Sequence, residues 1–391
     1  MKIGIEKSRL SRTWPRVALA AGVLILLSPA LTLLGTQHLR DKMMQQLTLK
    51  AMAEKITRGE AGDEARALSL FRWMHEHLYT PPKSKPGGEN IQEVLVRNIA
   101  WCSRQSDILA MLARAAWING GYVSLFGYDD ESHHTVSVLE LDGEFRMLDP
   151  FYGYVFTRED GGIATLDDVR ARGGQLKSTQ FAAVRRLRGA AADDYFRLFE
   201  PAHDWEVHIP SAPVWLKYMD YYYDVFGDRF LGLYQRFYFS RSDTDLFTKG
   251  RIRQLTGQFE EALEDYQRIL RSDYLAEPPV LKIDHSPVTK EVLDSETRFF
   301  RSQAYYDMKD YDACIRSVEE FLRIHPGSRW RDLACYYIGS SWEKKGAPEK
   351  AVEWYAMMDD EDLPVTPAPE RLVKILDAMA PRGPEIPQDN Q

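Results

Sequence analysis

The stretch HHTVSVLELDGEFRMLDP, residues 133–150, decides the fold of the first folded region of this chain. It contains two runs in which apolar and polar residues alternate, and Asp142 and Gly143 separate the two runs. Alternation with a period of two is typical of half-buried strands, and Asp-Gly is a strong signal for a two-residue hairpin turn. The stretch therefore predicts an antiparallel hairpin whose second strand ends at Asp149.

The turn also predicts which side chains share a face of this hairpin. If Leu141 pairs with Glu144, the register brings His134 and Asp149 to the same face, one diagonal step apart. Side chains alternate between faces along a strand, so His133 points to the other face. His134 is thus the predicted imidazole partner of Asp149, and a bulge in either strand would reverse this choice.

A cysteine precedes the hairpin at a position that favours reactivity. Cys102 begins a segment that predicts a helix, which Gly120 and Gly121 end. The helix has an apolar stripe formed by Ile108, Leu109, Leu112 and Ala116. The positive end of a helix and a neighbouring imidazole both stabilise a thiolate, so Cys102 is a candidate nucleophile. Cys314 and Cys335 have no histidine nearby in sequence and are predicted core residues, with an unsupported disulfide as the alternative.

The order of Cys102, His134 and Asp149, together with the Asp-Gly turn and the Asp-Pro end of the return strand, resembles the transglutaminase-like (papain-like cysteine peptidase) superfamily. The resemblance implies an α+β domain, a helix plus an antiparallel sheet. It further implies that Cys102 attacks a carbonyl, that His134 takes and returns the proton, and that Asp149 holds the imidazole tautomer. The backbone N–H of Cys102 and the side chain of Gln92 are the implied oxyanion donors. Hydrolysis and transfer to an amine both stay open.

Other chemistries find less support in the sequence. The net charge of −8 argues against a general nucleic-acid binder, whose affinity comes mainly from neutralising phosphates. His75 and His77 are two residues apart and cannot share a helix face, so they do not form a metal site. No phosphate-loop or dinucleotide motif is present. We therefore expect neither a metal nor another cofactor.

Residues 17–35 (VALAAGVLILLSPALTLLG) contain no charged side chain and are long enough to cross a bilayer as a helix. Residues 1–16 are rich in Lys and Arg, which predicts a cytoplasmic tail. The bulk of the chain would then be periplasmic or otherwise extracytoplasmic, on a single-pass anchor in the inner (cytoplasmic) membrane. A cleaved signal peptide is the alternative, although the run lacks an A-x-A cleavage site.

The remaining segments differ in character. Residues 36–63 are expected to form a helical stalk, and residues 64–155 the transglutaminase-like domain. Residues 156–245 form an aromatic-rich connector of unknown fold. Its aromatic side chains indicate core or domain-interface packing, with a glycan-stacking or membrane-interface surface as the alternative. Residues 361–391 are a mostly polar tail.

Residues 246–360 repeat a helical pattern. Ala262, Cys314 and Ala351 occupy equivalent positions in QFEEALEDYQRIL, DYDACIRSVEEFL and APEKAVEWYAMM, and Gly250 and Gly339 each lie twelve residues before such a position. The pattern resembles the tetratricopeptide repeat (TPR), which implies stacked helix pairs. A protein or peptide partner is expected on the face that these pairs present.

Two functions of different class follow. The first is a membrane-anchored cysteine amidase, peptidase or acyl transferase with repeats that bind a partner. The second is a non-catalytic scaffold or assembly factor of the cell envelope, for instance in polysaccharide production, in which the papain-like unit only binds.

Overall fold

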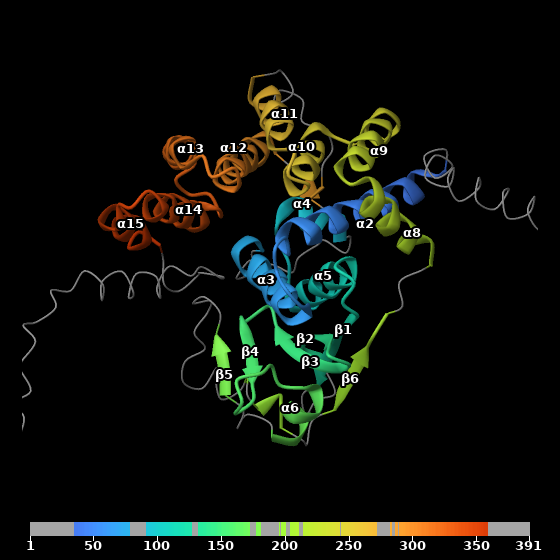
Figure 1. Cartoon of the computed structure of the whole chain (residues 1–391). Coiled ribbons are helices and arrows are strands. Elements are labelled where there is room, and N and C mark those ends of the chain that lie inside the picture. Colours follow the sequence, from blue (N-terminus) through green and yellow to red (C-terminus); the bar gives the residue numbers. More distant parts are fainter. Residues whose placement is uncertain are drawn as a thin grey trace, which may run out of the picture. The chain divides into compact units, whose positions relative to one another are not determined.

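The computed structural model describes residues 35–78, 91–126, 132–172, 177–180, 195, 197–200, 204–210, 214–242, 244–271, 282–283, 286–287 and 289–358 (Figure 1). The chain divides into two compact units, Met1–Ala51 with Ala212–Thr244 and Met52–Ser211 with Asp245–Gln391, and we describe each by itself. The predicted membrane span at 17–35 lies outside the described residues except for Gly35, and so does the predicted tail at 361–391. Among the described helices, none is long and apolar enough to cross a membrane.

Six antiparallel strands form the sheet of the larger unit, in the order β5-β4-β3-β2-β1-β6. The strands are β1 (Gly120–Phe126), β2 (Ser132–Leu141), β3 (Glu144–Asp149), β4 (Tyr154–Thr157), β5 (Lys177–Gln180) and β6 (Trp205–His208). Helices accompany this sheet, so the predicted mixture of helix and antiparallel sheet is confirmed.

The predicted hairpin is present with the predicted register. Leu141 pairs with Glu144, and Ser137 pairs with Leu148. Asp142 and Gly143 have φ values of 55° and 80°, which are the left-handed values that a type I′ turn requires at both central positions. The turn chemistry of two residues therefore sets the pairing of β2 with β3.

The segment predicted as a connector contributes to the sheet on both sides. Strand β5 pairs with β4, and β6 pairs with β1, so both edge strands come from residues beyond 155. A Cβ atom on Gly121 of β1 would overlap the carbonyl oxygen of His208 in β6, so this close pairing requires glycine. The sheet domain thus extends past the boundary expected at residue 155.

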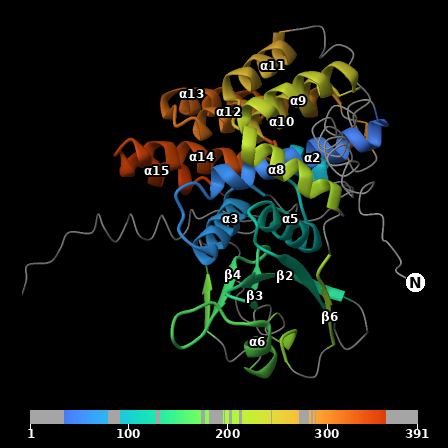
Figure 2. The same ribbon diagram turned by 45° about the vertical axis from the view of Figure 1, so that its right-hand side comes forward.

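Helices cover the sheet. Helix α5 (Cys102–Ala115) packs on β1 and β2, and α6 (Leu166–Arg172) packs on β3. Both views place α3 (Asp63–His77) and α5 on one side of the sheet and α6 on the other (Figure 2). The short helix α4 (Ile91–Arg97) precedes α5. A buried cluster fills one face of the sheet and consists of Val123, Leu125, Val136, Val138, Met147, Tyr154, Phe156, Ala164, Val169, Tyr195, Phe199 and Trp205.

Three helical hairpins follow in the described part of the chain. They are α10 (Leu246–Leu255) with α11 (Phe259–Arg271), α12 (Lys290–Asp307) with α13 (Tyr311–Ile324), and α14 (Arg331–Lys344) with α15 (Pro348–Tyr355). A two-stranded ribbon, β7 (Lys282–Ile283) with β8 (Ser286–Pro287), lies between the first two hairpins in sequence.

Each of the three helical hairpins contains a small residue that is buried. Ala262, Cys314 and Ala351 are completely buried. A Cβ atom on Gly250 would lie 2.8 Å from the ring of Tyr266, sixteen residues later, so the two helices of that hairpin approach closely there. Gly250 therefore allows α10 and α11 to pack closely.

The smaller unit contains α2 (Gln37–Ile56, to its boundary at Ala51), α8 (Val214–Phe226) and α9 (Asp228–Arg241). Residues 36–63 were expected to be a polar stalk, but α2 is buried along much of its length. Its polar side chains pair with the other two helices, because Gln46 donates to Asp220 at 2.8 Å and Lys50 lies 2.7 Å from Asp224. Gln46 and Lys50 thus join α2 to α8, although a polar segment would be expected to face solvent.

Only part of the aromatic cluster in α8 and α9 is buried, which corrects the expectation of core packing for the whole set. Tyr223, Tyr234 and Tyr238 are buried, whereas Tyr218, Tyr221, Phe226 and Phe237 are 41–55% exposed. The helical period distributes consecutive aromatic residues around each helix, so a dense aromatic run cannot bury all its members on one face.

Candidate active site

Cys102 is the first residue of α5, as the sequence predicts. Its N-cap residue, Trp101, has extended backbone angles and makes no side-chain capping bond. The first backbone N–H groups of a helix lack intrahelical acceptors and carry partial positive charge. The half-buried thiol therefore lies at the end of the helix that favours an anionic sulfur.

Two serines join α5 to the strand that carries His134. The Ser106 hydroxyl donates to the carbonyl of Thr135 at 3.0 Å, and the Ser137 hydroxyl donates to the carbonyl of Ser106 at 3.4 Å. Thr135 is the neighbour of His134 in β2, so these bonds fix the distance between the cysteine and histidine segments. Neither serine belongs to a sequence pattern that would indicate this role.

The hairpin brings His134 and Asp149 into contact. His134 Nε2 lies 2.7 Å from Asp149 Oδ2, and both side chains are almost completely buried. The predicted choice of His134 agrees with this contact, because no bulge interrupts the pairing of β2 with β3. The side chain of His133 lies outside the described residues.

Asp149 accepts three further hydrogen bonds, two of them from backbone groups. The N–H groups of Phe151 and Tyr152 donate to Oδ1 at 2.9 and 3.0 Å, and the Tyr195 hydroxyl donates to Oδ2 at 2.6 Å. Burial raises the pKa of Asp149, but the charge and hydrogen bond of His134, with those of the other donors, hold it below its ordinary value. The carboxylate is therefore stabilised as an anion inside the protein.

The imidazole of His134 is a strong base in this environment. Burial lowers its pKa, but the charge and hydrogen bond of Asp149, followed by the hydrogen bond and charge of Cys102, raise it to about 10. Because Nε2 contacts Asp149, Nδ1 is the ring nitrogen left for the thiol. The structure thus brings together all three residues that the sequence predicted.

Aromatic rings enclose the imidazole. Phe151, Tyr152 and Tyr195 surround His134, with ring centroids 5.1–5.7 Å from its own, and Trp101 stacks on Phe151 at 6.3 Å. Apolar walls around an ion pair exclude water and strengthen the interaction between its charges. Tyr195 comes from the segment predicted as a connector, where sequence gave no signal for a role beside Asp149.

Two further elements of such a site would be a second oxyanion donor and a metal ion. The side chain of Gln92, the implied second oxyanion donor, lies outside the described residues. In the part of the chain that the structure describes, no group of three His, Cys, Asp or Glu residues could hold a metal ion. A pocket of about 270 Å³ lies between other elements and contains none of the three residues; Trp73, His77, Gln254 and Asp307 are among those that line it.

The comparisons with known proteins agree with this geometry in part. Residues 50–155 match the model of the Transglutaminase-like superfamily, so the chain contains a transglutaminase-like domain in this region. No curated protein matches the chain. A crystal structure of a "putative protease" from Parabacteroides distasonis is similar at 14% identity and a TM-score of 0.24, covering 32% of this chain and 25% of that chain.

Proposed function

We propose that the transglutaminase-like domain is a cysteine enzyme that acts on an amide or peptide substrate through Cys102, His134 and Asp149. The proposal depends on one observation above all: a buried His134–Asp149 pair at 2.7 Å whose imidazole is hydrogen-bonded to a cysteine at a helix N-terminus. Such a constellation is recognised by geometry and roles, whatever the surrounding fold.

The reaction would run in two steps. The Cys102 sulfur, its proton held by His134, forms a bond to the substrate carbonyl carbon, and the C–N bond then breaks as the imidazolium gives its proton to the leaving amine. Water or a second amine next attacks the thioester carbonyl carbon while His134 accepts the proton of that attacking group. The C–S bond then breaks, which releases the acyl product and returns the Cys102 thiolate beside the imidazolium. Hydrolysis results in the first case and acyl transfer in the second.

The backbone N–H of Cys102 is our proposed donor to the tetrahedral oxyanion. It belongs to the first turn of α5, where N–H groups have no intrahelical acceptor. Gln92 is proposed as the second donor on the resemblance alone. Asp149 would keep the imidazole in one orientation and stabilise its charged form.

For the N-terminal segment and the helical hairpins, we propose the roles that their sequences indicate. The apolar run at 17–35 and the basic residues before it favour a single-pass anchor in the cytoplasmic membrane, with the bulk of the chain periplasmic. The three helical hairpins, whose small residues are spaced as in tetratricopeptide repeats, would recruit a protein partner or substrate.

A thiol-directed experiment tests the enzyme proposal. Iodoacetamide alkylation of the purified full chain, mapped by mass spectrometry, should modify Cys102 well before Cys314 and Cys335. The latter two are buried, and burial raises their pKa values to about 12 and about 11. Equal and slow alkylation of all three cysteines would contradict an activated Cys102.

Activity assays then separate the reaction types and the scaffold alternative. Incorporation of a fluorescent amine into glutamine-containing peptides reports acyl transfer, and peptide cleavage reports hydrolysis. Cys102→Ala and His134→Ala should abolish either signal. If both variants fully restore the function of a deletion strain while substitutions in the helical hairpins do not, the chain is a non-catalytic scaffold.

A further inference from the structure

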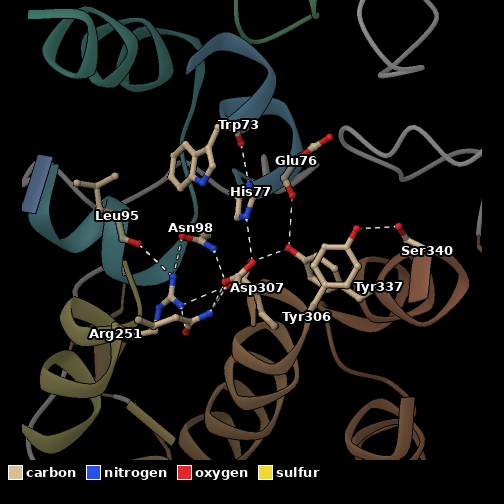
Figure 3. Close-up of polar contacts among 12 residues, drawn as sticks. Trp73, Glu76, His77, Leu95, Asn98, Arg251, Tyr306, Asp307, Tyr337 and Ser340 are labelled. Atoms are coloured by element: carbon tan, nitrogen blue, oxygen red, sulfur yellow. Dashed lines mark hydrogen bonds and ion pairs between the residues drawn. The ribbon is translucent and has the colours of Figure 1, made fainter. Parts of the chain in front are cut away.

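The first helices of the three hairpins contact the transglutaminase-like domain of the same chain (Figure 3). At the end of α3, His77 Nε2 lies 3.6 Å from Asp307 of α12, and the Tyr337 hydroxyl of α14 donates to the carbonyl of Glu76 at 3.4 Å. Asp307 and Tyr337, on the first helices of two hairpins, therefore contact α3 of the same chain.

A deeper contact reaches the end of α4. Arg251 of α10 donates from Nε to the carbonyl of Val96 at 2.7 Å and from Nη2 to the side-chain oxygen of Asn98 at 2.9 Å, with a longer contact from Nη2 to the carbonyl of Leu95 at 3.5 Å (Figure 3). The last carbonyls of a helix lack intrahelical donors and carry partial negative charge. Arg251 thus caps α4 from another part of the chain.

Arg251 is completely buried, and among the described residues no carboxylate forms an ion pair with it. Its charge is instead balanced by the α4 carbonyls, by the Asn98 and Gln254 side chains, and by the ring of Phe300, 3.8 Å from the guanidinium carbon. Moving a buried cation away from its partners is costly, so these contacts hold the end of α4 in one position. A guanidinium is suited to this role because it presents several donors in a fixed plane.

A second buried contact supports the same element. Arg97, the last residue of α4, donates to Glu296 of α12 at 2.8 Å, and Arg329 contacts the other oxygen of Glu296. Arg97 and Glu296 are both almost completely buried. Two hairpins therefore hold the C-terminal end of α4.

The end of α4 is joined to Cys102 by a four-residue loop, 98–101. Asn98 has a φ of 55°, a left-handed conformation that asparagine adopts more readily than most residues, and it is completely buried. At the other end of the loop, the carbonyl of Ala100 accepts a hydrogen bond from the Gln105 side chain at 3.1 Å. The loop is thus fixed by Arg251 on one side and by the first turn of α5 on the other.

We propose that Arg251 is a positioning residue for Cys102: through the carbonyls of α4 and Asn98, the helical hairpins set the position of the loop that precedes Cys102. This inference rests on the proposed function. The hairpins would then act on the reaction directly, as part of the structure that orders the nucleophile, and a shift of α10 would change the reactivity of Cys102.

The test measures the rate of alkylation of Cys102 by iodoacetamide as a function of pH in the purified full chain. Arg251→Lys keeps the charge but loses the planar set of donors. A displaced loop moves the thiol away from His134 and from the N-terminal end of α5, both of which favour the thiolate, so we expect the pH midpoint of alkylation to rise and the rate at neutral pH to fall by about tenfold. A purely structural role would lower the thermal midpoint and leave the pH midpoint of the folded protein unchanged.

Arg253→Gln is the matched control. Arg253 lies two residues away on the same helix and pairs with Asp265 of α11, 2.6 Å away, within its own hairpin. This control should leave both the rate and the pH midpoint of Cys102 at wild-type values. A wild-type profile in Arg251→Lys, with the protein folded by circular dichroism, overturns the proposal.

Asn98→Gly decides the case if Arg251→Lys does not fold. Glycine retains the left-handed backbone but removes the amide that bonds Arg251. A raised pH midpoint and a reduced rate at neutral pH in this variant support the positioning role, and a wild-type profile overturns it. Failure of the proposed function gives a different result from failure of this inference. If the proposed function is wrong, Cys102 of the wild-type chain reacts no faster than Cys314 and Cys335. If only this inference is wrong, wild-type Cys102 reacts fast and the variants match it.

Discussion

Tyr195 and His134 contact the same carboxylate oxygen: the Tyr195 hydroxyl lies 2.6 Å and His134 Nε2 lies 2.7 Å from Asp149 Oδ2. The two donors come from segments far apart in sequence and meet inside the protein. Together they stabilise Asp149 as an anion in contact with the imidazole.

Tyr195→Phe removes one donor and leaves the ring in place. Because hydrogen bonds to charged groups contribute about 1.5–3 kcal/mol, we expect a loss of that order in the free energy of unfolding, measured with urea at neutral pH. The pKa of Asp149 should rise, since the Tyr195 hydroxyl is one of the groups that lower it. Tyr218→Phe is the control, because Tyr218 is 41% exposed; an equal loss there would contradict the assignment.

The raised pKa of His134 predicts a pH-dependent stability. Its folded value of about 10 exceeds the ordinary value of 6.5, so the stabilisation due to the protonated ring is fully present below about 6.5 and is lost as the pH rises through about 10. Urea unfolding across this range should show the decline in the wild type. In Asp149→Asn the decline in stability should be much smaller, because a neutral amide does not favour the charged ring. An unchanged decline in this variant would mean that other titratable groups cause it.

The contact of His77 with Asp307 predicts a second pH dependence of the same sign. Burial lowers the pKa of His77, but the hydrogen bond and charge of Asp307, with the charge of Glu76, raise it above 6.5. The pair therefore stabilises the protein at acidic pH and loses this contribution as the pH rises through the folded pKa. Asp307→Asn should lower the thermal midpoint more at about pH 5.5 than at about pH 8.5, whereas the exposed substitution Glu319→Gln should not.

The close approach of α14 to α15 makes Gly339 sensitive to size. A Cβ atom there would lie 2.5 Å from the ring of Tyr355, so Gly339→Ala should destabilise the chain by about 1–3 kcal/mol in urea unfolding. Gly232→Ala is the matched control, because a Cβ atom at Gly232 of α9 meets nothing within 4 Å. There the higher helix propensity of alanine should leave stability unchanged or raised by up to about 1 kcal/mol.

The sequence was most informative where one local rule determines the structure. Asp142 and Gly143 specify the turn, the turn sets the register, and the register places His134 on the face of Asp149. Likewise, the apolar stripe after Cys102 predicts a helix that begins at the thiol. Each of these steps depends on residues that are neighbours in sequence.

The sequence was least informative where contacts join distant segments. Tyr195 lies 46 residues after Asp149, and its neighbours show no period that would place its hydroxyl in a core. Strands β5 and β6 have four residues each, too few for a reliable alternation. Arg251 and Glu296 belong to residue types that are almost always exposed, so their complete or near-complete burial had no signal in composition.

The origin of the two outer strands has a consequence for how the polypeptide is made and handled. Because β5 and β6 are translated after the four inner strands, a nascent chain that ends before β6 has the seven-residue strand β1 at the edge of its sheet in place of the four-residue strand β6. Unprotected strands of this kind pair readily with other molecules and aggregate. A fragment cut at residue 155 would share this liability on both sides, so recombinant expression should retain the polypeptide to at least His208.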